Sequence, residues 1–202
     1  RQNFDVKTGR LRSHNYNGEY AFRSGLSWSG LSSGGFSVRY VPQGFKFDAK
    51  GPMGFARRGK ELPYVLAFLN SSISQTLLEM LAPTMDYKIG QVLKLPLSNG
   101  IAGRSSIEAN AEACIAIARA DWDNFETSWE FHDQPLLRPG LKGATLQASW
   151  RKWEAQSADS ISRMRELETE NNRLFISGYA LVGELQPDVP EEQITLARAD
   201  VR

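Results

Sequence analysis

The residues of this chain that are best suited to binding a ligand lie in its first 60 positions. Residues 24–35 contain five serines and four glycines around Trp28. Serine hydroxyls and glycine amides donate hydrogen bonds to phosphate oxygens, and an indole ring stacks on a nucleobase. We therefore predict contacts with nucleic acid at these positions: Arg23, Ser27, Trp28, Ser32, Arg39, Lys50, Arg57 and Arg58. The alternative is an ordinary exposed turn between two strands, which composition alone favours.

Charge is distributed unevenly along the chain, which supports a polyanion contact in its front part. The first 60 residues contain eleven Lys and Arg against three acidic residues, whereas residues 151–202 carry an acidic excess. Residues 48–60 form a second loop with glycine and proline, whose cations could neutralise phosphates. A solvated basic turn explains that loop nearly as well. The net charge of only +1 argues against an autonomous nucleic-acid-binding domain.

No catalytic constellation is recognisable in the sequence. It contains no phosphate-binding loop of the Walker type, no HExxH or GxSxG motif and no Cys/His cluster. His14 and His132 are isolated, so we predict no metal site and no catalytic residue. The single Cys114 follows an apolar helical pattern and is expected to be a small core residue in a reducing compartment. Because no apolar run approaches about 20 residues, we expect a cytoplasmic protein that contacts no membrane.

Composition and patterning predict an α+β fold. Hydrophobic residues make up 41% of the chain and charged residues 23%, as in ordinary globular domains. Between residues 17 and 55, aromatic and β-branched residues alternate with glycine and serine, which predicts strands and turns. We expect residues 36–41 and 44–48 to form a hairpin across the turn at 42–44. Residues 24–35 are expected to be an exposed loop.

Helices are predicted for most of the remaining chain. Apolar residues recur at helical spacing from Pro63 to Pro83, which predicts one helix of about five turns. Residues 87–97 should dock as a short segment against the same core. A second helix is expected from Ser106, its cap, followed by the connector at residues 133–143. Its inward stripe comprises Ile107, Ala111, Cys114, Ile115, Ala118, Trp122 and Phe125.

The longest predicted element runs from Ala144 to about Glu184, a stretch without proline that follows an approximate heptad seam. A rise of 1.5 Å per residue gives one helix on the order of 60 Å. Its apolar side must be buried, either against the first helices or against a missing domain or partner. The expected architecture is a small twisted β-sheet packed on helices, with a long C-terminal helix. We divide it into an α/β domain at 1–100, a helix and connector at 101–143, and the long helix and tail at 144–202.

Four separated motifs occur in a specific order along the chain. An asparagine-serine helix at residues 68–78 leads through residues 81–90 into Leu95-Pro96-Leu97, as in specificity domains of DNA methyltransferases. The other three motifs are residues 45–52, 122–131 and 168–175. Together they resemble the large adenine-specific DNA methyltransferases of bacteriophage-exclusion (BREX) systems, over about residues 17–196.

The resemblance implies a parent protein that uses S-adenosylmethionine to methylate N6 of an adenine extruded from the DNA duplex. Residues 1–100 would then be its target-recognition-like domain. The catalytic Asn/Asp-Pro-Pro-Tyr/Phe motif and the glycine-rich S-adenosylmethionine loop of that family do not occur here. We therefore expect an excised part of the methyltransferase with no cofactor of its own. Its expected partners are double-stranded DNA, the rest of the methyltransferase chain and other subunits of the defence system.

Two rival hypotheses stay open at this point. In the first, the chain is a protein docking module whose long helix binds another subunit of a defence or restriction-modification complex, and the loop arginines are dispensable. In the second, the chain is an enzyme by itself and uses catalytic residues that follow no known motif. Methyl transfer from S-adenosylmethionine to DNA by the chain alone would establish the second.

Overall fold

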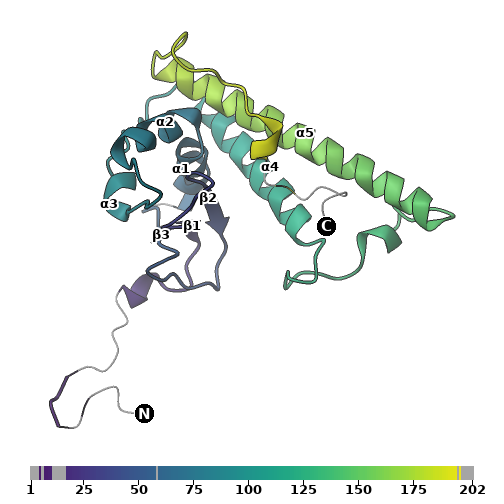
Figure 1. Cartoon of the computed structure of the whole chain (residues 1–202), viewed down its shortest axis with the longest axis horizontal. Coiled ribbons are helices and arrows are strands. Elements are labelled where there is room, and N and C mark those ends of the chain that lie inside the picture. Colours follow the sequence, from purple (N-terminus) through teal and green to yellow (C-terminus); the bar gives the residue numbers. More distant parts are fainter. Residues whose placement is uncertain (1–4, 6, 11–16, 58, 195, 197–202) are drawn as a thin grey trace.

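A computed structural model shows a three-stranded sheet packed on helices (Figure 1). It describes residues 5, 7–10, 17–57, 59–194 and 196. The predicted α+β class, with a small sheet on helices and a long C-terminal helix, is confirmed. The strands are β1 (Gly25–Trp28), β2 (Val38–Val41) and β3 (Met53–Gly54). The helices are α1 (Leu62–Leu69), α2 (Ser72–Leu81), α3 (Ile89–Val92), α4 (Arg104–Trp122) and α5 (Leu146–Gly178), with short 3-10 helices η1 (Gly18–Tyr20), η2 (Gly59–Glu61), η3 (Pro135–Leu137) and η4 (Glu191–Gln193).

β1 is the central strand and pairs antiparallel with β2 on one side and β3 on the other. The expectation that residues 24–35 form one exposed loop is therefore wrong for the first half of that range. Leu26 and Trp28 lie two residues apart and point to the same face, where both are buried in the core shared with α1. β3 approaches β1 closely at Gly25, because an added Cβ there would lie 2.6 Å from the carbonyl oxygen of Gly54.

The predicted hairpin between residues 36–41 and 44–48 is also wrong. β2 pairs with β1 instead, and residues 44–48 are not a strand. The turn before them does form, with Gly44 at φ +104°, and it brings the chain back to Phe22. The N–H of Phe22 donates to the carbonyl oxygen of Phe45 (3.0 Å), and its carbonyl oxygen accepts from the N–H of Gly44 (3.0 Å). Strand-like composition did not identify the partner, because strand pairing depends on tertiary context.

The single helix predicted from Pro63 to Pro83 is interrupted at Asn70 and Ser71, which separate α1 from α2. The side chain of Asn70 accepts from the N–H of Val38 (2.8 Å) and donates to its carbonyl oxygen (2.9 Å). Ser71 caps α2, since its hydroxyl accepts from the N–H of Ser74. The asparagine-serine pair of the sequence motif is thus the joint that fixes the sheet to the helices.

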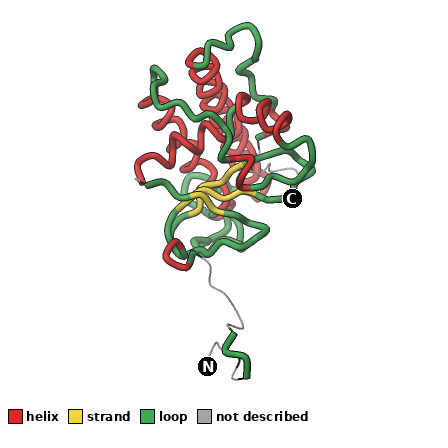
Figure 2. The backbone as a smooth tube through the Cα atoms, turned by 90° about the vertical axis from the view of Figure 1, so that its left-hand side faces the viewer, coloured by secondary structure: helices red, strands yellow, loops and turns green. Residues whose placement is uncertain are grey.

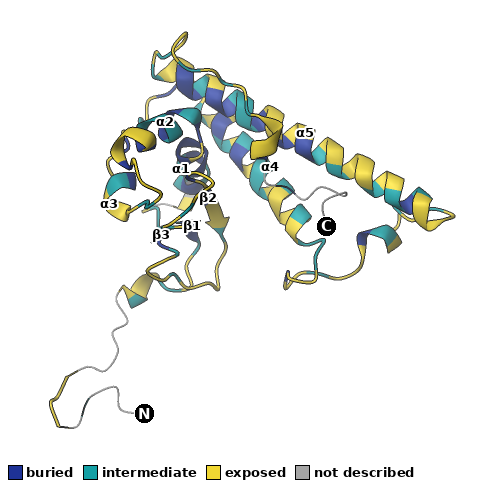
Figure 3. Ribbon diagram, in the orientation of Figure 1, coloured by how far each residue is buried: buried dark blue, intermediate teal, exposed yellow. Residues whose placement is uncertain are grey.

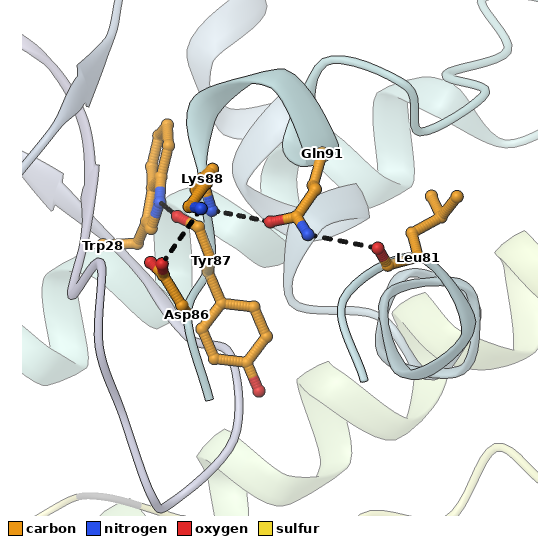
Figure 4. A network of polar contacts seen from close by, with 6 residues as sticks. All are labelled: Trp28, Leu81, Asp86, Tyr87, Lys88 and Gln91. Carbon is orange, nitrogen blue, oxygen red and sulfur yellow. Dashed lines mark hydrogen bonds and ion pairs between the residues drawn. The ribbon is translucent and has the colours of Figure 1, made fainter. Parts of the chain in front are cut away.

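Residues 87–97 dock against the core as predicted, through the buried side chains of Val92 and Leu95. This segment contains α3, which is held in place by Gln91 (Figure 4). The amide of Gln91 accepts from the N–H of Lys88 (2.8 Å) and donates to the carbonyl oxygen of Leu81 at the end of α2 (3.1 Å). Backbone groups at both ends of the linker between α2 and α3 are therefore satisfied by one side chain.

α4 and α5 pack along each other and bury the central part of the predicted seam, which Figure 3 shows in dark blue. Ile161, Met164 and Leu167 of α5 are all buried. Asn171, which interrupts the apolar seam, is also buried and accepts a hydrogen bond from the side chain of Asn110 on α4 (3.0 Å). Of the two alternatives for its apolar side, α5 returns against the first helices over this stretch.

The ends of these two helices differ from the expected ones. α4 starts after Gly103, at φ +83°, and not at Ser106. α5 starts after Thr145, whose hydroxyl accepts from the N–H of Ala148 (3.2 Å), and it ends at Gly178, shortly before Ala180 takes up φ +57°. Its 33 residues correspond to about 50 Å at 1.5 Å per residue. Of the helices that the structure describes, none has the length and apolarity that crossing a membrane requires.

Candidate nucleic-acid interface

Ser27 and Arg39 lie directly opposite each other in the register of β1 and β2, so the fold brings these two predicted contact residues together. Residues that face each other across an antiparallel pair share one face of the sheet. Alternation along β1 turns this face away from Leu26 and Trp28, whose face packs on α1. Arg39 is exposed and Ser27 is partly exposed. Figure 2 shows loops, and no long helix, on the side of the sheet opposite the helices.

Arg23 is exposed just before β1, where aromatic rings orient its side chain. Its guanidinium lies over the ring of Tyr20, 5.3 Å from the centroid, and over that of Phe55 at 6.0 Å. A guanidinium on an aromatic face keeps the N–H donors at its edge available for a ligand. Arg23 is therefore positioned before any ligand arrives.

The loop around Lys50 is shaped by a carboxylate. Asp48 accepts hydrogen bonds from the N–H groups of Gly51 and Lys50 (both 2.7 Å), and these bonds lower the pKa of its carboxyl group. The carbonyl oxygen of Lys50 accepts from the N–H of Gly30 (3.0 Å), which ties the loop to the chain just after β1. The ammonium group of Lys50 thus extends from an ordered, exposed turn.

Arg57 follows a segment that lies beside the start of β1, whereas Lys50 is tied to the chain just after the end of β1. Phe55 packs beside Gly25, because its ring carbon lies 3.1 Å from the position of an added Cβ there. The chain that follows β3 therefore runs along the start of β1, where Arg57 is exposed two residues later. Arg58, the next predicted contact, lies outside the described residues.

Trp28 does not fit the contact role predicted for it, whereas Ser32 is compatible with its predicted role. Trp28 is only 5% exposed, and its indole N–H donates to the carbonyl oxygen of Tyr87 (3.0 Å; Figure 4). A buried indole with a satisfied N–H has no free face for a base, so we correct this assignment to a core role. Ser32 is partly exposed and its hydroxyl accepts from the N–H of Gly34 (3.3 Å). Its contact with a phosphate stays a prediction.

An exposed aromatic pair that was not predicted from the sequence lies near these residues. Phe45 is 46% exposed and stacks on Trp129, which is 89% exposed, with ring centroids 5.9 Å apart. A local signal was present in Phe45-Lys46-Phe47, where an exposed cation separates two aromatic residues. Trp129 follows α4, so only the fold brings it to this place.

Two known proteins are similar in sequence to this chain, one over nearly its whole length and one over two thirds of it. An alignment that is 202 residues long and covers 98% of this chain gives 43% identity with the adenine-specific methyltransferase PglX of Lacticaseibacillus casei (strain Zhang). The chain is related to adenine-specific methyltransferases. Over 138 residues, 67% of this chain, it is also 33% identical to the adenine-specific methyltransferase BrxX of Escherichia coli O9:H4 (strain HS).

The relationship predicted from the four sequence motifs is thereby confirmed. The chain spans 17% of the length of PglX, and its match with BrxX covers 11% of that protein. Most of each relative therefore lies outside the segment that this chain matches. No family model matches the chain.

Two titratable groups of the helical part are strongly affected by burial. Burial raises the pKa of Glu168 on α5 from 4.5 to about 7. Burial, together with the charge of Glu168, raises the pKa of Cys114 on α4 to about 12. The thiol of Cys114 therefore stays protonated near neutral pH, and a thiol in this state is a poor nucleophile.

Replacing Glu168 with glutamine is expected to change how the stability of the chain depends on pH. The folded state holds the Glu168 proton more tightly than the unfolded state does. The stabilising contribution of this proton to the free energy of unfolding is therefore complete below about pH 4.5 and is lost as the pH rises through about 7. At pH 8 Glu168→Gln should raise the free energy of unfolding by on the order of 1–3 kcal/mol. Urea unfolding at several pH values measures this, with the exposed Glu154→Gln as control. An equal gain at pH 4 would contradict it.

Proposed function

We propose that one side of this chain recognises double-stranded DNA for an adenine-specific methyltransferase that uses S-adenosylmethionine in phage defence. This side, which we call the sheet side, is the side of the sheet opposite the helices, with Ser27 and Arg39 on the strands and the loops around them. Relatedness to PglX and BrxX supports the reaction class. Residues 1–100 serve as the recognition unit, 101–143 as helix and connector, and 144–202 as long helix and tail. Methyl transfer belongs to another part of the parent protein, because the catalytic motif and the cofactor loop are absent from these 202 residues.

The observation that carries the proposal is a set of exposed arginines on the sheet side without an ion-pair partner in the described part of the chain: Arg23, Arg39 and Arg57. Lys50 is also exposed, and its charge acts on the nearby carboxylate of Asp48. Several arginines of the helical part are paired, such as Arg104 with Glu108 (2.8 Å) and Arg173 with Glu170 (2.6 Å). Cations without a carboxylate partner are available to neutralise phosphates, which releases condensed counterions and drives binding. The sheet side therefore offers the phosphate contacts that a recognition unit needs.

Replacing Arg57 and Arg58 together with alanine is expected to weaken duplex binding and to flatten its salt dependence. If each side chain contacts one phosphate, the slope of log K against log salt should fall by about 1.8, or about 0.9 per contact. Fluorescence anisotropy with a labelled duplex at several salt concentrations measures the slope. The matched control is Arg151→Ala with Arg165→Ala, which removes two exposed charges from α5. An unchanged slope, or an equal change in the control, would refute this patch.

A docking module is the second candidate function, and a group of exposed apolar side chains favours it. They lie on α2, on α3, between these helices and directly after α3, and they are 38–79% exposed: Met80, Leu81, Met85, Ile89 and Leu93. Exposed apolar groups of this kind often mark interfaces with other proteins. The salt experiment separates the two candidates, because a docking module that binds no DNA has no salt-dependent affinity to lose.

A further inference from the structure

Five aromatic side chains, which we call the aromatic row, lie in η1 and in loops around the sheet: Tyr20, Phe45, Phe47, Phe55 and Trp129. Tyr20 packs on Phe55 with ring centroids 5.2 Å apart, and Phe55 packs on Phe47 at 5.8 Å. Phe45 stacks on Trp129 at 5.9 Å. Phe45 and Phe47 connect these two groups, because only Lys46 separates them in the chain. Segments from η1, the front loops and the chain that follows α4 thus contribute two aromatic groups, which are adjacent in the chain at Phe45 and Phe47.

The aromatic row is open to solvent. Trp129 is 89% exposed, Phe45 46% and Tyr20 37%, and the other two members are partly exposed. Trp129 therefore contributes little buried area to the core, although tryptophan is the largest apolar side chain. A stacked, exposed aromatic pair is the kind of surface that a ligand with a flat apolar face would cover.

The backbone beside the aromatic row is held in an unfavourable conformation. Phe22 has φ +67°, in the left-handed region that bulky residues rarely adopt, and its side chain is 60% exposed. Its two backbone hydrogen bonds with Gly44 and Phe45 keep it there. Strain that persists in an exposed loop is typical of functional segments. The hydrogen bond from the N–H of Phe22 also holds the backbone of Phe45, which is part of the row.

Nucleobases are the flat ligands that the charges around the row favour. Proteins that bind single-stranded DNA stack successive bases on aromatic side chains, while cations between the rings contact the backbone. Arg23 lies over the rings of Tyr20 and Phe55, and Lys46 is exposed between Phe45 and Phe47. Glu19 and Glu130 are exposed next to the two ends of the row. Because these charges balance, stacking must supply most of the binding energy at the row.

We propose that the aromatic row binds DNA bases that have left the base stack, beside the duplex that the sheet side recognises. This inference rests on the proposed function and adds a second subsite to it. Arg39, Lys50 and Arg57 neutralise phosphates of paired DNA, whereas the row, with Arg23 and Lys46 beside it, takes unpaired bases through their faces. Together the two subsites hold a duplex that is locally opened.

The test compares two labelled DNAs of equal length, one fully paired and one with a central run of unpaired thymines. The 202-residue chain is expected to bind the DNA with unpaired bases more tightly. Trp129→Ala should lower the affinity for that DNA by about 5- to 150-fold and leave the affinity for paired DNA unchanged. Trp129→Phe should retain most of the affinity, because it keeps a ring. A 2-aminopurine among the unpaired bases should lose fluorescence when it stacks on the wild-type chain.

The matched control is Trp122→Ala, which removes a tryptophan that is 54% exposed at the end of α4 and is not part of the row. Thermal unfolding of the Trp129 variants should match that of the wild type. Equal affinities of the wild-type chain for the two DNAs, or a Trp129→Ala variant that behaves like the control, would overturn the proposal that the row binds unpaired bases. In that case a salt dependence that falls in the Arg57 and Arg58 variant would still support recognition of paired DNA. Failure of the wild-type chain to bind either DNA would overturn both proposals.

Discussion

Replacing Phe175 with alanine should lower the free energy of unfolding by about 3–5 kcal/mol. Phe175 on α5 is 0% exposed. Its ring packs on Tyr64 and Phe68 of α1, with centroids 5.6 Å and 5.7 Å away. The substitution removes the ring from the place where α1 meets α5, and the surrounding helices can fill the resulting cavity only in part.

Urea unfolding followed by circular dichroism measures this loss. Leu146→Ala is the control, because Leu146 lies on the same helix but is 73% exposed and should change stability by less than about 0.5 kcal/mol. A Phe175→Ala variant as stable as this control would show that α5 does not pack on α1 in solution.

Replacing Gly25 with alanine is expected to weaken both the fold and DNA binding. The new Cβ would lie 2.6 Å from the carbonyl oxygen of Gly54 and 2.9 Å from the end of the Met53 side chain. The backbone oxygen cannot move away without separating β1 from β3, and overpacking of this kind costs about 1–3 kcal/mol. Arg57 follows β3 in the chain, so the same displacement moves a proposed phosphate contact and should lower the affinity for duplex DNA.

Gly54→Ala is the matched control, because it also adds one methyl group to the sheet. The nearest atoms to its Cβ lie at 3.9 Å, which is ordinary van der Waals contact, so stability and DNA affinity should stay close to those of the wild type. Unfolding and anisotropy are measured on both variants. Equal losses in the two variants would contradict the close approach of the strands at Gly25.

The contact residues predicted for the two paired strands divide according to the face of the sheet to which they point. Ser27 and Arg39 meet because the register of β1 and β2 places them opposite each other, and that register could not be read from composition. Trp28 is one residue further along β1 and therefore points to the core. Glycine and serine content alone does not distinguish a loop from a central strand whose alternate residues are buried.

The sequence by itself determined the class of fold, the relationship to adenine-specific methyltransferases and the presence of helices. The inward stripe predicted for α4 is confirmed at Ile107 and Ala111, which are buried, and is wrong at Ala118 and Trp122, which are exposed near the end of the helix. Helices follow from sequence because their hydrogen bonds are local and their buried residues recur every three to four positions, as Ile161, Met164 and Leu167 do. Only the tertiary structure decided where Asn70 breaks the first helix, since the side chain binds the backbone of a distant strand at Val38.

The tertiary structure also decided which strands pair and which aromatic residues meet. Strands satisfy their hydrogen bonds with partners that are remote in sequence, so residues 44–48 could not reveal that they return to Phe22 and not to β2. The contact between Phe45 and Trp129 likewise joins segments that only the packing of α4 beside the sheet side brings together. Neighbouring residues are enough to predict local structure, whereas a surface built from several segments forms only when the chain folds.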